Sequence, residues 1–72
     1  MTPSEIINQV NNQFSVNVLE RKGPNNQRHA DAVHTAALQL RNEGLTYQQI
    51  GLELNRDASS VYRGIKRIQR DS

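Results

Sequence analysis

Apolar residues recur at three- and four-residue spacing in four stretches of this chain, separated by polar or glycine-containing segments. Such spacing is typical of amphipathic helices that bury one face. The pattern therefore predicts an all-α fold, a small helical bundle that forms a single domain over residues 1–72. The predicted elements are helices over about residues 3–13, 26–42, 46–54 and 58–70, a short helical turn at 17–21 and a basic loop at 21–26.

The first predicted helix has a strong start signal. Thr2 can cap it, Pro3 suits its first position, and Glu5 can complete a capping box. Its outward positions are uncharged Asn and Gln residues, so we expect a structural role for it. The face that should be buried consists of Ile6, Ile7, Val10 and Phe14.

The segment that follows is rich in valine and ends in a basic loop. We expect Val16, Val18 and Leu19 to lie against the core, with Asn17 capping one helical turn. A strand would suit these residues too, but a lone strand has no partner in this chain. The loop over residues 21–26 is either a solvated connector or a basic arm that reaches the DNA minor groove, which favours inserted cations.

The longest predicted helix, residues 26–42, should end at Gly44, the residue type expected just beyond a helix C-terminus. Arg28 lies in its first turn, where the helix dipole favours anions over cations. A phosphate contact would explain that cation. The expected core face is Ala30, Val33, Ala37 and Leu40, with Ala36 and Leu38 at its margins.

The stretch LTYQQIGLELNRDASSVYRGIKRIQR, residues 45–70, predicts two helices joined by a tight turn. Thr46 and Gln49 form a second capping box, and Asp57 is a natural N-cap for the last helix. Gly51 is small enough for a close approach at the turn, and Gly64 for close packing against a neighbouring helix. The residues expected inside are Ile50, Leu54, Val61, Ile65 and Ile68.

The opposite side of the last helix collects small polar residues and cations. At ~100° per residue, Ser59, Arg63, Lys66 and Arg70 lie away from Val61. A short helix, a tight turn and a helix with an exposed cationic side are typical of a helix-turn-helix that binds DNA. An ordinary solvated helix face would show the same charges.

Composition narrows the function further. The formal net charge is only +2, but cations gather in residues 21–28 and 56–70, which indicates a localised site for a polyanion. There is no cysteine, and the two histidines, His29 and His34, fall on different sides of a helix, so neither a metal nor a cofactor is expected. No apolar run is long enough to span a membrane, and no signal peptide is evident. We expect a soluble, cytoplasmic monomer.

Motifs for catalysis are missing from the sequence. The carboxylates are scattered, and no glycine-rich phosphate-binding loop occurs. Ser59 and Ser60 have no His or Lys base nearby in sequence, and their place after a helix cap explains them. We therefore expect neither an enzyme nor a small-molecule substrate.

The residues IGLELNRDASSV, positions 50–61, resemble the signature I-G-x-x-F-G-G-R-D-H-[ST]-T-V of the C-terminal DNA-binding domain of the bacterial chromosomal replication initiator DnaA. The apolar first helix, VLERK before a basic loop, and LRNEGLTYQQIG follow the order of that family as well. The resemblance covers nearly the whole chain. It implies a helix-turn-helix that binds double-stranded DNA.

The sequence also departs from the family pattern. The two family glycines before R-D become a single Asn55, and the family histidine becomes Ala58, which removes one family base contact. The helix led by Arg28 is about two residues longer than usual. The ATPase domain of the initiator is not present in this chain. We therefore expect a small regulator or accessory protein, such as one encoded by a mobile element or phage, that binds DNA without remodelling it.

Carried over residue by residue, the resemblance implies a set of DNA contacts. Arg56 would hold the turn or contact a phosphate, and Ser60 would touch a base or the backbone. Asp57 would read a base unless capping uses its carboxylate fully. The other implied contacts are Ala58 and Ser59 at base edges, Tyr47 and Gln48 near the backbone or groove edge, Arg21 and Lys22 near the minor groove, and Arg28 at a phosphate. The cationic helix adds Arg63, Lys66, Arg67 and Arg70.

The sequence thus predicts a double-stranded DNA-binding protein, either replication-initiator-like or a transcriptional regulator. One alternative is a protein-interaction module that binds an acidic partner, such as another replication or transcription factor. Another is a generic repressor- or recombinase-like helix-turn-helix, which would need neither the first helix nor the basic loop.

Overall fold

The computed structural model describes residues 2–20 and 26–71, apart from the side chains of 26 and 69–71. Within these residues the chain forms four α-helices and no strand, so the predicted all-α helical bundle is confirmed. The helices begin and end within one residue of the expected positions. They are α1 (Pro3–Phe14), α2 (Asn26–Asn42), α3 (Tyr47–Leu54) and α4 (Ala58–Asp71).

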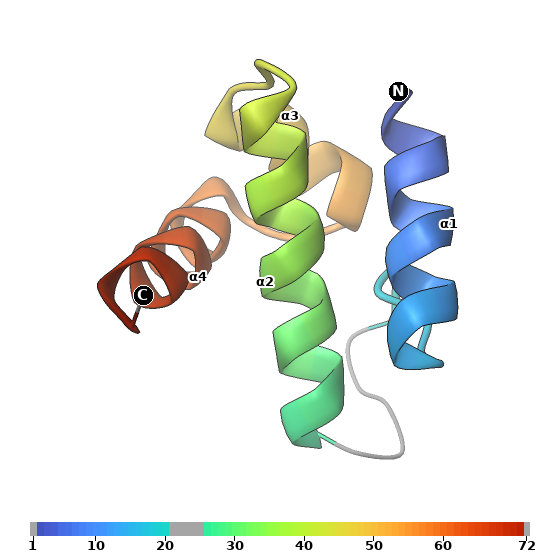
Figure 1. Ribbon diagram of the computed structural model, residues 1–72. Coiled ribbons are helices and arrows are strands. Elements are labelled where there is room, and N and C mark those ends of the chain that lie inside the picture. Colours follow the sequence, from blue (N-terminus) through green and yellow to red (C-terminus); the bar gives the residue numbers. More distant parts are fainter. Residues whose placement is uncertain (1, 21–25, 72) are drawn as a thin grey trace.

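Helix α2 is the centre of the bundle. It packs against α1, α3 and α4, and α3 also packs against α4. Figure 1 shows α1 and α4 on opposite sides of α2, with the short α3 near the C-terminal end of α2. The two helices of the expected helix-turn-helix are therefore neighbours, and α1 supports the bundle from the other side.

One apolar core joins all four helices. The most deeply buried large side chains come from every helix and from the segment after α1, and each is at most 2% exposed. This is the face that the helical spacing predicted, because a helix buries residues three and four apart. These side chains are Ile6, Val10, Val18, Leu40, Ile50, Leu54 and Ile65.

Local capping signals define the helix ends as expected. Capping boxes form at Thr2 with Glu5 and at Thr46 with Gln49. Gly44 has φ 98°, and the Leu45 N–H bonds to the Leu40 carbonyl at 3.3 Å, which is the Schellman closure of α2.

The turn after α3 closes in the same way. Asn55 takes the left-handed conformation with φ 58°, and the Arg56 N–H donates to the Gly51 carbonyl at 2.7 Å. A single left-handed residue therefore reverses the chain here, where the resembled family has two glycines. Asparagine tolerates this conformation better than most residues, which explains its presence.

The segment between α1 and the loop contains the single turn that was expected, over residues 17–20. The Asn17 carbonyl accepts from the Glu20 N–H at 3.1 Å, and the Asn17 side chain caps the turn by accepting from the Leu19 N–H at 3.1 Å. Val18 is fully buried, and its N–H donates to Asn11 Oδ1 at 2.9 Å. Val16 is partly buried and packs against the core as expected, whereas Leu19, also expected there, is 43% exposed.

Burial on α1 and α2 also departs from the expectation in detail. Phe14 and Ala30 are only partly buried, whereas Ala32 and His29 are buried core residues that the sequence did not single out. None of the helices in the described part of the chain is long and apolar enough to cross a membrane.

Candidate nucleic-acid interface

The outer face of α4 is polar, cationic and exposed. Turning ~100° per residue, Ser59, Tyr62, Arg63 and Lys66 fall within a sector of about 100° opposite the buried side. Each of them is exposed, whereas Val61 is buried. Arg67 is exposed at one margin of this sector. Among the described residues, no carboxylate pairs with Arg63, Lys66 or Arg67, so these charges face solvent.

Short side chains lie at the start of α4. Ala58 is half-buried, and Ser59 and Ser60 are exposed. The Asp57 carbonyl accepts the first helical bond, from the Val61 N–H at 3.1 Å, so Asp57 occupies the N-cap position. Its carboxylate is exposed and accepts no hydrogen bond from any described residue. Asp57 thus occupies the N-cap position without forming the expected side-chain cap, and its carboxylate remains accessible to a ligand.

Gly51 sets the approach of α3 to the turn. A Cβ built on Gly51 would lie 2.5 Å from the Arg56 carbonyl oxygen and 3.4 Å from the Ala58 nitrogen. Because these neighbours are backbone atoms, they cannot rotate away from a larger side chain. The predicted need for a small residue at this position is confirmed.

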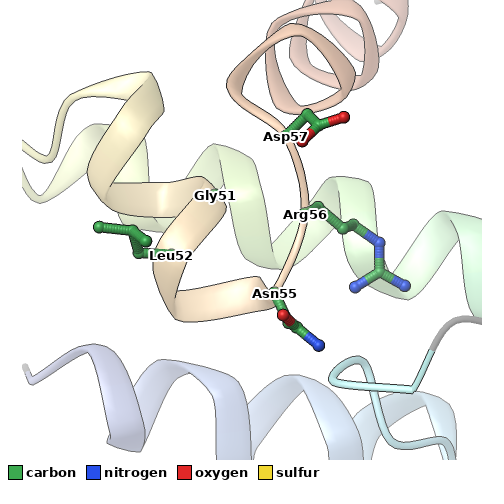
Figure 2. Close-up of a pocket in the computed structure, with 5 residues that line it drawn as sticks. All are labelled: Gly51, Leu52, Asn55, Arg56 and Asp57. Atoms are coloured by element: carbon green, nitrogen blue, oxygen red, sulfur yellow. The ribbon is translucent and has the colours of Figure 1, made fainter.

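Arg56 lies on the inner side of the same turn. Its Nη1 donates to the carbonyls of Val18 and Leu54 at 2.6 and 2.7 Å, and its Nη2 donates to the carbonyl of Glu20 at 2.8 Å. Figure 2 shows Arg56 and the exposed Leu52 pointing in opposite directions from the turn. Arg56 was expected either to hold the turn or to contact a phosphate. These hydrogen bonds show that it holds the turn.

His29 completes this arrangement, which we call the Arg56 clamp: Arg56, His29 and the carbonyls of Val18, Glu20 and Leu54. His29 is only 4% exposed, and its Nε2 lies 2.6 Å from the Glu20 carbonyl. A carbonyl oxygen can only accept, so we assign the proton to Nε2. The 3.2 Å approach of Arg56 Nη2 to this nitrogen is then a contact between two donors. His29 Nδ1 is buried and has no described partner.

The second histidine lies between α2 and α4. His34 is half-buried, and its ring fills the space where a Cβ of Gly64 would be, so the close packing predicted at Gly64 is confirmed. Burial lowers the pKa of His34 below 6.5, and the charges of Arg67 and Arg56 lower it further, while Asp31 opposes them. Within the described residues, no group of three or more His, Cys, Asp or Glu side chains could hold a metal ion.

Two tyrosines and two cations form a connected row on the surface, which we call the cation–aromatic row. Tyr47 and Tyr62 meet edge to face, with ring centroids 5.2 Å apart. The Arg41 guanidinium carbon lies 4.8 Å from the Tyr47 centroid, and Lys66 Nζ lies 5.5 Å from the Tyr62 centroid. Neither Arg41 nor Tyr62 was predicted as a contact from the sequence. Only the four-residue spacing of Tyr62 and Lys66 could have signalled a pair.

A shallow hollow of about 460 Å³ connects this row to the start of α4, lined by Tyr47, Ala58, Ser59, Tyr62 and Arg63. Gln48 lines a neighbouring hollow beside Ala58. The structure thus brings together most of the predicted contacts of the α3–α4 unit: Tyr47, Gln48, Asp57, Ala58, Ser59, Ser60, Arg63, Lys66 and Arg67.

The remaining predicted contacts are elsewhere or undescribed. Arg28 is exposed in the first turn of α2, at the end of that helix remote from α3 (Figure 1). The structure does not describe Arg21, Lys22 or the side chain of Arg70. The expected minor-groove arm over residues 21–26 therefore lies almost entirely outside the described residues.

The exposed side of α3 and α4 is therefore the part of the described chain where cations, small polar groups and aromatic rings converge. Such an open, cationic surface with only shallow hollows suits an extended polyanion better than a small molecule. Comparisons of the chain with models of protein families, with curated proteins and with solved structures find no match.

Proposed function

We propose that this domain binds double-stranded DNA, with α3 and α4 acting as a helix-turn-helix and α4 lying in the major groove. The observation that carries the proposal is the outer face of α4. Ser59, Arg63 and Lys66 share one exposed side, and no described carboxylate neutralises the two cations. A cationic helix side of this kind attracts the phosphate backbone.

The shape of the α4 start favours groove entry. An α-helix with its side chains is about 10–12 Å wide, close to the ~12 Å width of the major groove. The short side chains of Ala58, Ser59 and Ser60 let the backbone approach base edges. Arg63 and Lys66, one and two turns further along, would then reach phosphates.

The resemblance to the DNA-binding domain of replication initiators supports the same orientation. It assigns base contacts to Asp57, Ala58 and Ser59. All three lie at the accessible start of α4, and Asp57 keeps its carboxylate exposed. Ala58 would offer only an apolar contact to a thymine methyl group. A small replication-initiator-like protein or a transcriptional regulator is the class of function we propose.

The first test is a salt titration with random-sequence duplex. If about six cations meet phosphates, log K should fall with log salt with a slope of about −5. A slope near zero would exclude duplex binding and favour an acidic protein partner instead. Single-stranded DNA of the same length serves as the comparison ligand.

Two variants separate phosphate contact from base readout. Arg63→Met should weaken binding to all duplexes alike, because a phosphate contact carries no sequence information. Ser59→Ala should instead change the preference between duplexes selected from a random pool. If both variants bind every duplex as the parent does, α4 is not the recognition helix.

A further inference from the structure

The cation–aromatic row crosses three helices. Arg41 comes from the last turn of α2, Tyr47 from the first turn of α3, and Tyr62 and Lys66 from α4. Each cation lies over the ring beside it, and the two rings meet at an interplanar angle of 85°. Residues that belong to separate helices in the sequence thus form one continuous cationic edge.

The Arg41 side chain is fixed from two sides. Its Nη1 donates to the Leu45 carbonyl at 2.8 Å, within the Schellman closure of α2, and its guanidinium stacks over Tyr47. A guanidinium has five N–H donors. Arg41 is exposed, so donors beyond the one bound to Leu45 can reach an incoming anion.

The row meets the outer face of α4 at one margin, through Tyr62, and Lys66 extends from the middle of that face over the Tyr62 ring. By helical rotation Tyr62 is at the margin next to α3, whereas Arg67 is at the margin next to α2, where Gly64 meets His34. A helix in the major groove lies between two sugar–phosphate backbones. The two margins of α4 would therefore face different strands.

We infer that the cation–aromatic row is a contact for the sugar–phosphate backbone of one strand, and that Arg41 is a phosphate-binding residue of this domain. The inference rests on the proposed duplex binding. The chemistry that the row recognises is a line of phosphates, because Arg41 and Lys66 present positive charge at its two ends. The tyrosines hold these charges in place before binding.

Ordering a long cationic side chain before binding raises affinity without changing the number of charges that meet the DNA. Immobilising a flexible side chain on binding costs roughly two- to tenfold in affinity, and a side chain that is already ordered avoids part of that cost. Counterion release depends only on the number of cations that meet phosphates. Ring removal and charge removal should therefore give different signatures in a salt titration.

Arg41→Met tests the charge. It should reduce the magnitude of the log K–log salt slope by about 0.9 and lower affinity roughly five- to tenfold near 0.1 M salt, equally for all duplexes. Gln9→Glu is the matched control. It lowers the net charge of +2 by the same single unit, but on the exposed side of α1 across the bundle, and should leave the slope unchanged.

Tyr62→Leu tests the ring. It keeps Lys66, so the slope should equal that of the parent while affinity falls roughly two- to tenfold at every salt concentration. Arg41→Lys keeps the charge at the other end of the row and should likewise retain the slope. Thermal unfolding of each variant verifies that the duplex titrations use folded protein.

The outcomes distinguish the two proposals. If the parent itself shows a slope near zero, duplex binding fails and the inference fails with it. If the parent binds with a steep slope and Arg41→Met has the same slope, the row does not contact phosphate. The inference then fails, while the proposed duplex binding by α4 is unaffected. A reduced slope in Arg41→Lys would also overturn the inference, since that variant retains the cation.

Discussion

Arg56 and Arg63 belong to the same basic stretch, yet they occupy opposite environments. Arg56 faces the inner side of the α3–α4 turn and donates to three backbone carbonyls. Arg63 projects from the outer face of α4, and no carboxylate in the described residues pairs with it. One arginine joins parts of the chain, whereas the other is available to a ligand.

The difference shows that a count of cations is not a count of ligand contacts. The turn over residues 17–20 is not a helix, so the carbonyls of Val18 and Glu20 need donors from elsewhere. Arg56 supplies those donors with the planar, fixed fork of its guanidinium, for which lysine has no equivalent. Such an arginine contributes to stability through the fold and adds little to the electrostatic attraction of DNA.

The largest expected effect is the loss of stability when Arg56, the inner arginine of this comparison, is replaced. Arg56→Met should lower the free energy of unfolding by about 3 kcal/mol, because hydrogen bonds from a charged donor contribute about 1.5–3 kcal/mol and three carbonyls lose theirs. Arg63→Met should change stability by less than about 0.5 kcal/mol, as exposed positions usually do. Urea unfolding followed by circular dichroism measures both.

DNA titrations of the same pair sharpen the contrast. Under conditions where Arg56→Met remains folded, its salt slope should match that of the parent, whereas Arg63→Met should lose about one unit of slope. If Arg63→Met proves the more destabilised variant, or Arg56→Met the one with the smaller slope, the assignment of inner and outer arginines is wrong.

A smaller effect is expected at the glycine that lets the turn close. Gly51→Ala should cost about 2 kcal/mol, because the new Cβ would meet the Arg56 carbonyl and the turn would have to shift. Gly64→Ala should cost less, since its obstacle is the His34 ring, which can rotate, whereas the obstacle at Gly51 is backbone; the helix-propensity gain of about 1 kcal/mol applies to both positions. Equal losses for the two variants would show that the turn backbone is adaptable.

The smallest effect concerns pH. The pKa of His34 is lowered by burial and by Arg67, so the folded state binds a proton less readily than the unfolded chain does. The free energy of unfolding should therefore be highest, with respect to His34, above pH ~6.5. It should decline as the pH falls from that value toward the lower pKa of His34 in the folded state. Thermal unfolding between pH 7.5 and about 5 measures this loss, and His34→Gln should reduce it. An unchanged pH dependence in His34→Gln would exclude His34 as its source.

The fold was predictable from sequence because its signals are local. Capping at Thr2 and Thr46, the Gly44 termination and the three- and four-residue apolar spacing each act within a few residues. The exposed face of α4 follows from the same rotation that buries Val61. These features need no knowledge of how the helices pack.

The features that were not predictable from the sequence depend on contacts between distant segments. The clamp joins Arg56 to carbonyls 36 and 38 positions earlier, and Arg41 meets Tyr47 only because the α2–α3 loop folds it back. The buried His29 follows from the same clamp. No local pattern distinguishes such an arginine or histidine from a solvated one.

The clamp and the core also bear on the generic helix-turn-helix alternative. In that interpretation the first helix and the basic loop would be dispensable. Ile6, Val10 and Val18 are core residues, and the carbonyls of Val18 and Glu20 bind Arg56. Deleting residues 1–24 would therefore remove part of the interior, so loss of binding by that truncation would report unfolding.

The exposed side of α1 carries no cation, and this has a kinetic consequence. Its Asn and Gln side chains and Glu5 lie across the bundle from the cations of α4, so between these two described helices the positive pole lies at α4. In the field of a polyanion such a body rotates during approach until its positive pole leads. Added salt should then slow the encounter, and protein held on a DNA-coated surface would present α1 to the solution.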